Sequence, residues 1–274
     1  MRVLGVVGDD DADLVKRLAR CCRDRGRTAV VTRGDTDLVR AASDTDGSRV
    51  ETDTEAYDEW VLGPDGWRAT TTEPRDVSDL LDRLAETYDY ALLGGFPDAR
   101  VPAIVVGDVD PAGEVLGRVD RPADVSAAAV LDDLEGAREW ESLASLVAAV
   151  TDLPAADRAG AVATFTGRVR TRDGPDDTPT ERLEFDYHEA GMDRQMAAIR
   201  SDLADREGVH AVRLHHRTGT VEAGEDIVFV VVMAGHREEA FRAVSDGIDR
   251  LKDEVPLFKK EVTVADSYWA HEDC

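Results

Sequence analysis

The stretch FRAVSDGIDRLKDEVPLFKKE, residues 241–261, combines the strongest helical pattern of the chain with most of its lysines. Its apolar residues recur with the period of an α-helix, so one apolar stripe is expected to pack inward: Phe241, Val244, Ile248, Leu251 and Val255. Pro256 lacks the backbone N–H that a helix needs, so the helix is expected to stop there. The pattern therefore predicts a packed helix that continues into a loop.

The four lysines of the chain are unevenly distributed, because Lys16 stands alone and Lys252, Lys259 and Lys260 fall within 251–261. Elsewhere arginine carries the positive charge. Arginine stays protonated, whereas the reactivity of lysine is tuned by its surroundings, so lysines kept in an arginine-rich chain favour a chemical role. The alternative is that a helix end and the loop after it carry solvated cations. The pattern by itself leaves both interpretations open.

Two other segments of the second half end in basic residues. Residues 160–170 are typical of a strand that ends at Arg168 and Arg170, and a later apolar strand leads into His236 and Arg237. Together with the lysines, these cations could converge into one anion-binding pocket. Spacing alone does not establish that convergence.

The first half begins with a strand, a helix and a second strand. Residues 2–8 form a short apolar run that ends in glycine, Leu14 and Leu18 mark one face of the helix, and residues 28–32 follow as a strand. This order predicts an α/β, P-loop-like domain with a parallel sheet.

The turn after the first strand departs from a phosphate-binding loop of the form G-x-x-x-x-G-K-[ST]. After Gly8 the matching positions hold Asp13, Leu14 and Val15, and residues 9–11 are all aspartate. Carboxylates there repel phosphate, and the missing lysine and hydroxyl remove contacts to the nucleotide and Mg²⁺. Nucleotide hydrolysis is therefore not expected.

Acidic residues dominate the composition: the chain has 274 residues, 58 Asp and Glu against 33 Lys and Arg, and a formal net charge of −25. An acidic, lysine-poor surface is typical of proteins adapted to high salt and disfavours nucleic-acid binding. The three cysteines lack metal-ligand spacing and a pairing pattern, which favours a reducing, cytoplasmic compartment. No run approaches the roughly 20 apolar residues of a membrane-spanning helix.

The six histidines show neither H-x-H nor H-x-x-x-H spacing. No metal site is therefore predicted. A structural role is expected for His188, His215 and His216, which lie in or beside predicted strands.

The length of the chain allows two domains. We expect an N-terminal domain over residues 1–120, an acidic, alanine-rich linker over 121–140 with a helical pattern at 125–134, and a C-terminal domain over 141–274.

Three segments of the first half, residues 6–8, 88–96 and 98–105, resemble the MobB family, the GTP-binding adapter of molybdopterin-guanine dinucleotide biosynthesis. Where that family has Glu-Gly-Phe, this chain has Gly94-Gly95-Phe96, a further departure from nucleotide hydrolysis. The resemblance implies a degenerate MobB-like module that binds a partner or docks a later enzyme of the same pathway. The alternative is a nucleotide-binding adapter for molybdenum cofactor maturation that acts through this domain, with the second half as a scaffold.

Six segments of the second half, in order, are similar to the MoaE family, the large catalytic subunit of molybdopterin synthase: residues 163–170, 187–192, 216–219, 224–228, 234–237 and 251–261. The resemblance implies an α+β fold of the α/β hammerhead type. It also implies a homodimer of this chain with a small ubiquitin-like sulfur carrier at each end, hence a heterotetramer.

The resemblance further implies a sulfurtransferase reaction without a bound cofactor. The C-terminal Gly-Gly thiocarboxylate of the carrier donates sulfur to cyclic pyranopterin monophosphate, which yields the dithiolene of molybdopterin. Carried onto this chain, Lys252 and Lys259 are the expected catalytic residues. The expected substrate-binding residues are Arg168, Arg170, His236, Arg237, Lys260 and Glu261.

Overall fold

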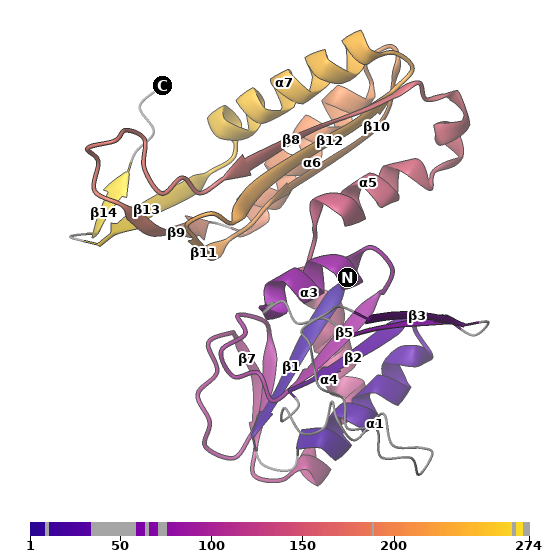
Figure 1. The fold of residues 1–274 in the computed structure, drawn as a ribbon, viewed down its shortest axis with the longest axis vertical. Coiled ribbons are helices and arrows are strands. Elements are labelled where there is room, and N and C mark those ends of the chain that lie inside the picture. The colour runs from indigo at the N-terminus through magenta and orange to yellow at the C-terminus, as the bar shows by residue number, and fades with distance from the viewer. Residues whose placement is uncertain are drawn as a thin grey trace. The chain divides into compact units, whose positions relative to one another are not determined.

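The computed structural model divides the chain into two compact units, Met1–Trp140 and Glu141–Cys274, each with its own sheets and core (Figure 1). It describes residues 1–8, 11–33, 59–63, 66–70, 76–187, 189–264 and 267–270. Asp9, Asp10, His188 and Cys274 lie outside the described residues.

The N-terminal unit is built on a five-stranded parallel sheet in the order β2-β5-β1-β6-β7, which confirms the predicted α/β architecture. Its strands are β1 (Arg2–Gly8), β2 (Thr28–Thr32), β5 (Tyr90–Gly94), β6 (Ala103–Val106) and β7 (Val115–Val119). The segment around Trp60 forms an antiparallel hairpin, β3 (Glu59–Gly63) and β4 (Gly66–Thr70).

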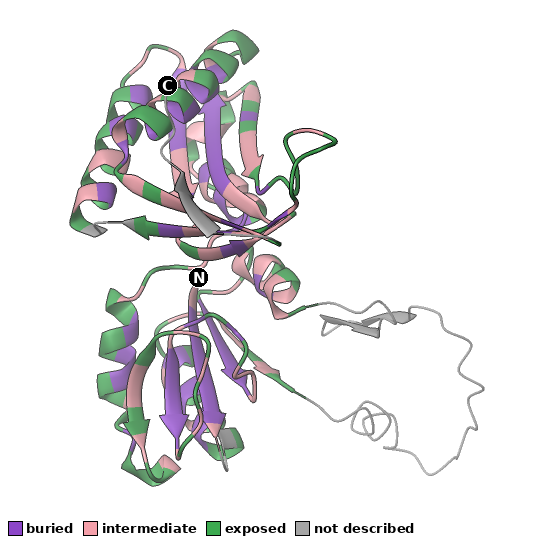
Figure 2. Cartoon of the chain, turned by 90° about the vertical axis from the view of Figure 1, so that its left-hand side faces the viewer, coloured by how far each residue is buried: buried purple, intermediate pink, exposed green. Residues whose placement is uncertain are grey.

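Helices cover both faces of this parallel sheet. Helices α1 (Asp11–Arg23) and α4 (Ala127–Gly136) pack on one face, and α3 (Val77–Ala85) packs on the other. Because successive side chains of a strand alternate between faces, Leu4 and Val6 join the α1 side while Val3 joins the α3 side. The central strands β1, β5 and β6 are buried, the edge strands β2 and β7 are partly exposed, and Figure 2 shows the outward faces of the helices exposed.

Gly8, at the end of β1, is required by the packing of the backbone. It has a φ of 130°, and a Cβ at this position would lie 1.9 Å from the carbonyl oxygen of Val106 on β6. The glycine that resembles the start of a phosphate-binding loop is therefore explained by the close approach of two strands, without a nucleotide.

Residues 121–140 are not a linker, contrary to the prediction from their acidic composition. They contain a short 3₁₀ helix, Pro122–Asp124, and α4, whose Val130, Leu131 and Leu134 are buried in the core shared with β1 and α1. Arg17 of α1 donates hydrogen bonds to the carbonyl oxygens of Pro122 and Val125, at 2.7 and 3.0 Å. The segment is acidic only on its outer face, and so it belongs to the N-terminal unit.

The burial of α4 can be tested by truncating one side chain. Leu134 is 0% exposed, so Leu134→Ala should lower the free energy of unfolding by about 2–5 kcal/mol. Chemical denaturation of the full chain measures this change, and Asp133→Ala on the exposed face of the same helix is the matched control. Equal effects of the two variants would contradict the packing of α4.

The C-terminal unit contains two antiparallel sheets, and with its helices it has the predicted α+β fold. The three-stranded sheet, in the order β10-β12-β8, consists of β8 (Ala161–Arg168), β10 (Val209–His216) and β12 (Asp226–Ala234). The four-stranded sheet, in the order β11-β9-β13-β14, consists of β9 (Thr180–Tyr187), β11 (Gly219–Glu222), β13 (Leu257–Thr263) and β14 (Ser267–Ala270).

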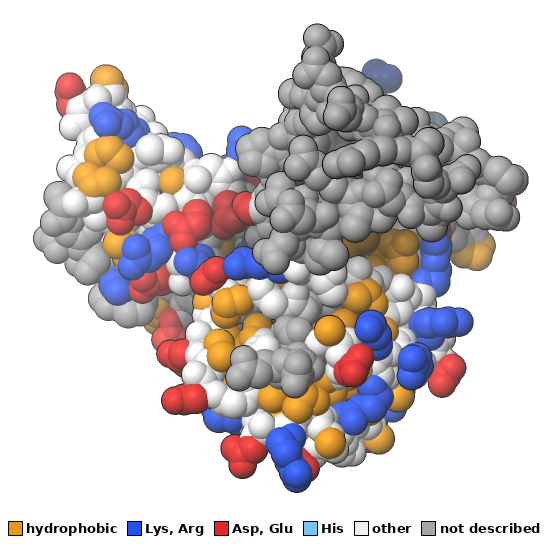
Figure 3. Space-filling view, turned by 60° about the horizontal axis from the view of Figure 1, so that its bottom comes forward, with side chains coloured by type: hydrophobic (Ala, Val, Ile, Leu, Met, Phe, Trp, Pro, Cys, Tyr) orange, Lys and Arg blue, Asp and Glu red, His pale blue; other side chains and the backbone are white. Residues whose placement is uncertain are grey.

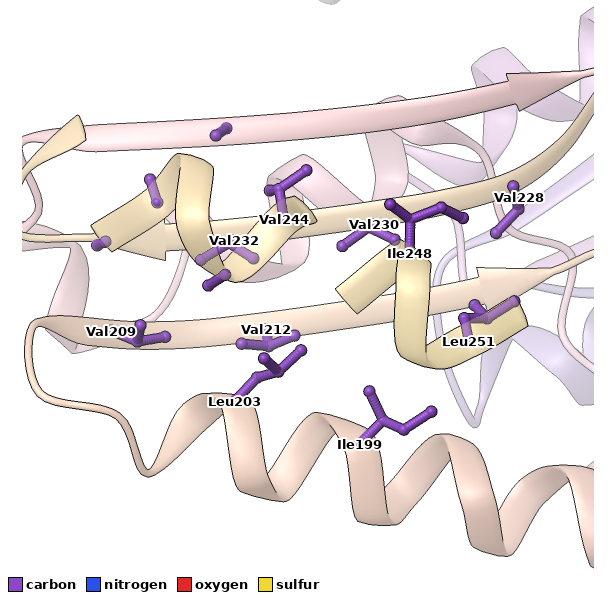
Figure 4. Packing of buried hydrophobic residues seen from close by; sticks show 14 of the residues in the cluster. Ile199, Leu203, Val209, Val212, Val228, Val230, Val232, Val244, Ile248 and Leu251 are labelled. Atoms are coloured by element: carbon purple, nitrogen blue, oxygen red, sulfur yellow. The ribbon is translucent and has the colours of Figure 1, made fainter. Parts of the chain in front are cut away.

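The central strand β12 carries two cores, one on each face. Val228, Val230 and Val232 pack beneath α6 (Glu189–Ala204) and α7 (Arg237–Glu254), as Figure 4 shows for Ile199 and Ile248 of these helices. The alternating residues of β12 face α5 (Leu143–Thr151) and the 3₁₀ helix Pro154–Arg158. A strand buried on both faces explains the unbroken apolar run in the sequence.

The helix predicted within residues 241–261 ends before Pro256, as expected, but two details of the prediction were wrong. Phe241 does not belong to the inward stripe, because its side chain is 64% exposed, while Ala240, Ala243 and Gly247 allow α7 to approach the sheet. After Pro256 the chain continues as β13 rather than as a loop. The turn from α7 into β13 positions the lysines.

The exposed charges of both units form many local ion pairs. Examples are Arg25 with Asp132 at 3.1 Å and Arg121 with Asp124 at 2.8 Å. On the face shown in Figure 3, Lys and Arg side chains lie among Asp and Glu side chains. Exposed pairs of this kind each contribute little to the stability of the fold, because solvent screens the charges.

Candidate functional site

A cavity of about 1010 Å³ lies in the C-terminal unit, between the end of β8, the segment 169–180, β13 and the last turns of α7. Its wall includes apolar side chains from β8, α7, β13 and β9. Its charged lining consists of Arg168, Arg170, Arg172, Lys252, Lys259, Asp173, Asp177 and Glu261. Five cations around one cavity are notable in a chain with a net charge of −25.

The last turn of α7 presents Lys252 to this cavity. Leu251, next to it, is 2% exposed and packs in the core, so the rotation of the helix is fixed and Lys252 faces outward. Among the residues that the structure describes, the Lys252 ammonium has no ion-pair partner. A cation at the end of a helix is also stabilised by the helix dipole.

Lys259 and Lys260 are neighbours in β13, and their side chains lie on opposite faces of the strand. Lys259 and Glu261 line the cavity, whereas Lys260 points to the opposite face of the strand, where its Nζ lies 3.0 Å from Glu184 Oε2 on β9. This follows from the alternation of side chains along a strand. The predicted substrate-binding role of Lys260 is therefore wrong for the arrangement within one chain.

Glu261 is held in place by a second strand. Its Oε1 accepts a hydrogen bond from the Oγ1 of Thr180, which is buried at the start of β9. This contact joins β13 to the end of the segment 169–180, so Glu261 shapes the wall of the cavity next to Lys259.

The two predicted arginines reach the cavity with different partners. Arg168 at the end of β8 is held by Asp226 of β12, with Nε 3.0 Å from Oδ1, and its Nη2 donates to the carbonyl oxygen of Gly224. Among the described residues, Arg170, two residues later, forms an ion pair with the nearby Asp173, with Nη1 2.9 Å from Oδ1. Arg168 is thus fixed by the sheet, whereas Arg170 is paired within its own loop.

His236 and Arg237 do not join the cavity within one chain. They are exposed at the start of α7, where His236 is the residue that precedes the first helical turn. Lys252 follows His236 by 16 residues, which places it about 24 Å away along the helix. The predicted convergence therefore does not occur inside a single copy.

His216 and Arg172 are among the residues of the cavity that were not predicted as site residues. His216 is 7% exposed; its Nδ1 lies 2.6 Å from the carbonyl oxygen of Arg217, and its ring meets the edge of Phe185 at 4.8 Å. The alternation of Val212, Leu214 and His216 along one strand placed His216 on an inward face, which is the signal that could have found it. Arg172 lies in the loop after β8 and had no pattern in the sequence.

Cations above an apolar and aromatic wall suit a flat anionic ligand, because guanidinium and ammonium groups bind phosphate and the rings cover the rest of the ligand. Among the described residues, no three His, Cys, Asp or Glu side chains are grouped so as to hold a metal ion.

The sequence profile of the MoaE protein family matches residues 138–254. A protein of Haloferax volcanii described as a probable molybdopterin synthase is 44% identical over 275 residues, which span 99% of this chain and 100% of that protein. The chain belongs to the molybdopterin synthase family. Because the match spans 99% of this chain, it includes both of its units.

The match to the synthase family is concentrated in the second unit. The molybdopterin synthase catalytic subunit of Pyrococcus abyssi is 34% identical over 114 residues, which cover 42% of this chain and 76% of that protein. This chain is thus a molybdopterin synthase catalytic subunit, which acts in molybdenum cofactor biosynthesis. No helix in the described ranges is long and apolar enough to cross a membrane.

The N-terminal unit resembles a solved structure of the MobB family, as predicted. MobB of Bacillus subtilis is 18% identical, with a TM-score of 0.36, and the match covers 50% of this chain and 100% of that one. A likeness of this size carries no conclusion about the function of the unit.

The stability that the Lys260–Glu184 ion pair contributes should be lost in acid. The hydrogen bond from Lys260 holds the pKa of the Glu184 carboxyl below its usual value. A depressed carboxyl pKa stabilises the fold above the unfolded-state pKa, and this contribution is lost as the pH falls through the folded-state value.

Lys260→Met should therefore have a lower Tm than the native chain at pH 7, and the difference should close below about pH 4. Thermal unfolding at a series of pH values measures it. A difference that is constant across that range would contradict the assignment.

Proposed function

We propose that this chain transfers sulfur from the C-terminal thiocarboxylate of a small ubiquitin-like carrier to cyclic pyranopterin monophosphate. The observation that carries the proposal is that Lys252 and Lys259, from two different elements, line the same cavity as Arg168 and Arg170. The product is the dithiolene of molybdopterin.

The stoichiometry of sulfur transfer defines what the cavity must do. Each transfer forms a carbon–sulfur bond on the pterin side chain, and the carrier leaves with a carboxylate whose new oxygen comes from water. Two carriers are consumed for each dithiolene. The site must therefore hold an anionic pterin through both transfers while protons move at the reacting carbons.

The residues of the cavity have the chemistry for these tasks. Arg168, fixed by Asp226, is suited to hold the cyclic phosphate by charge-assisted hydrogen bonds, with Arg170 as a second donor. Lys252 and Lys259 are suited to stabilise negative charge on the intermediates and to move protons. Glu261 orients the wall beside Lys259 through its bond to Thr180.

The volume of the cavity supports two occupants. At about 1010 Å³ it is at the upper end of the range of ordinary ligand sites, about 300–1,000 Å³. A pterin of ordinary size leaves room for an extended glycine-glycine tail. Glycine has no side chain, so such a tail can enter a channel that excludes other residues.

A homodimer would bring His236 of one copy close to the lysines of the other copy. No described strand pairs with the outer edge of β8, and Val162 on this strand is 41% exposed. A free edge of this length is a ready surface for a second copy.

Antiparallel pairing of two β8 edges places opposite ends of the strand side by side. One end lies next to Ala234 and hence near His236, and the other end is Arg168 at the cavity. We therefore assign His236 and Arg237 to the cavity of the second copy, as further ligands of the substrate.

Loss of either catalytic lysine should abolish the reaction. Lys252→Ala and Lys259→Ala should each lower product formation by about 10²–10⁴-fold, the usual range for a proton-transferring group. The measurement is molybdopterin formed from the cyclic precursor and purified thiocarboxylated carrier. Lys260→Ala is the matched control, because Lys260 points away from the cavity. If Lys252→Ala and Lys259→Ala folded normally and kept full activity, the lysines would be solvated surface cations.

Mixed dimers can test whether His236 acts in the second copy. Lys252→Ala and His236→Ala chains should each be weakly active alone. Mixed at equal amounts, they should recover about a quarter of the native activity, since half of the dimers are mixed and each has one intact site. Exchange is followed by size-exclusion chromatography of differently tagged chains. No recovery in proven mixed dimers would contradict the shared site.

A further inference from the structure

The segment that follows β8 contains its own counter-ion for a substrate-binding arginine. Arg170 and Asp173 both line the cavity, and their side chains are 76% and 69% exposed. Among the described residues, Asp173 is the carboxylate that pairs with Arg170, whereas Arg168 is held by Asp226 from another strand. The two arginines therefore differ in what must change for a ligand to reach them.

The loop 170–179 is anchored at its ends and closed upon itself between them. Val169 exchanges backbone hydrogen bonds with Gly224 and Glu225, and Thr180 binds Glu261. Inside the loop, the backbone N–H of Gly174 donates to Asp177 Oδ2 at 2.6 Å, and Arg172 donates to the carbonyl oxygen of Pro175. Opening the Arg170–Asp173 pair requires no displacement of a strand.

We propose that Asp173 competes with the anionic group of the substrate for Arg170, so that the loop exchanges an internal ion pair for the ligand when the cavity fills. This inference rests on the proposed function, which makes Arg170 a ligand of the cyclic phosphate. It adds a specificity-determining residue that binds no substrate itself.

The competition depends on two properties of the Arg170–Asp173 ion pair. The pair is weak, and its carboxylate is always close to the guanidinium. An exposed pair of this kind is worth little, so a ligand displaces it at small cost. Because Asp173 is tethered three residues from Arg170, its carboxylate is present at a constant effective concentration and excludes anions that only one cation would hold. A phosphate that also meets Arg168 and the lysines can displace it.

Such selectivity suits an acidic protein in strong salt. Long-range attraction is screened over about 3 Å at 1 M salt, so Arg170 would otherwise be occupied by abundant small anions. The Asp173 carboxylate holds the Arg170 guanidinium near the cavity and competes with these small anions for it.

The test is a binding series with cyclic pyranopterin monophosphate and the full chain, by calorimetry in low salt. Asp173→Asn should bind about 1.4- to 5-fold more tightly than the native chain, the factor expected from losing one exposed ion pair. Its KM should fall by the same factor with kcat unchanged, because only uniform binding is altered. Asp176→Asn is the matched control, since Asp176 is exposed in the same loop and does not line the cavity.

A double-mutant cycle separates the pair from the general charge of the loop. Arg170→Ala should bind more weakly, and Asp173→Asn should then have no further effect. Unchanged or weaker binding by Asp173→Asn would overturn the inference, as would an equal gain in Asp176→Asn or a gain that persists in the Arg170→Ala background.

The proposed function fails separately, when the native chain makes no molybdopterin from precursor and charged carrier. If the Arg170→Ala variant bound the substrate as tightly as the native chain, Arg170 would not be a ligand and Asp173 would not be a competitor. If Arg170→Ala weakened substrate binding and Asp173→Asn left it unchanged, only the competing role of Asp173 would be overturned.

Discussion

The end of α7 at Pro256 is the constraint on which the cavity depends. Proline cannot continue the hydrogen-bond ladder and disfavours helical geometry at the residue before it, and Val255 accordingly adopts an extended backbone with φ −85° and ψ 123°. The chain therefore leaves the helix and enters β13 at once. Lys252 on the last helical turn and Lys259 on the strand face one cavity because this turn is short and both flanking segments are packed.

The cations in and around the cavity are held in four different ways. Lys260 is neutralised by Glu184 on the far side of β13, Arg168 is braced by a carboxylate from a neighbouring strand, and Arg170 is paired only within its own loop. Lys252 has no ion-pair partner in the described part of the chain. Among the cations that line the cavity, Lys252 is thus left available and Arg170 is easily released, and this difference arises from position, since the residue types are alike.

Much of the fold followed from local patterns. The parallel sheet of the first unit and the buried strand β12 were predictable because apolar runs and glycine breaks identify such strands. Residues 121–140 were misjudged because composition hides a buried face when the exposed positions are acidic. Phe241 was misjudged because helical spacing fixes an angle and does not say how wide the buried face is.

The sequence by itself determined the types of residue at the site, the helix that ends at Pro256, and the resemblance to the family. These are properties of neighbouring residues or of order along the chain. Tertiary structure alone decided that Lys259 and Lys260 face opposite ways, because strand alternation applies only once β13 pairs with β9. It also decided that His236 lies a helix length from Lys252, and that Asp226 and Asp173 hold different arginines, since distances between separate elements are set by packing.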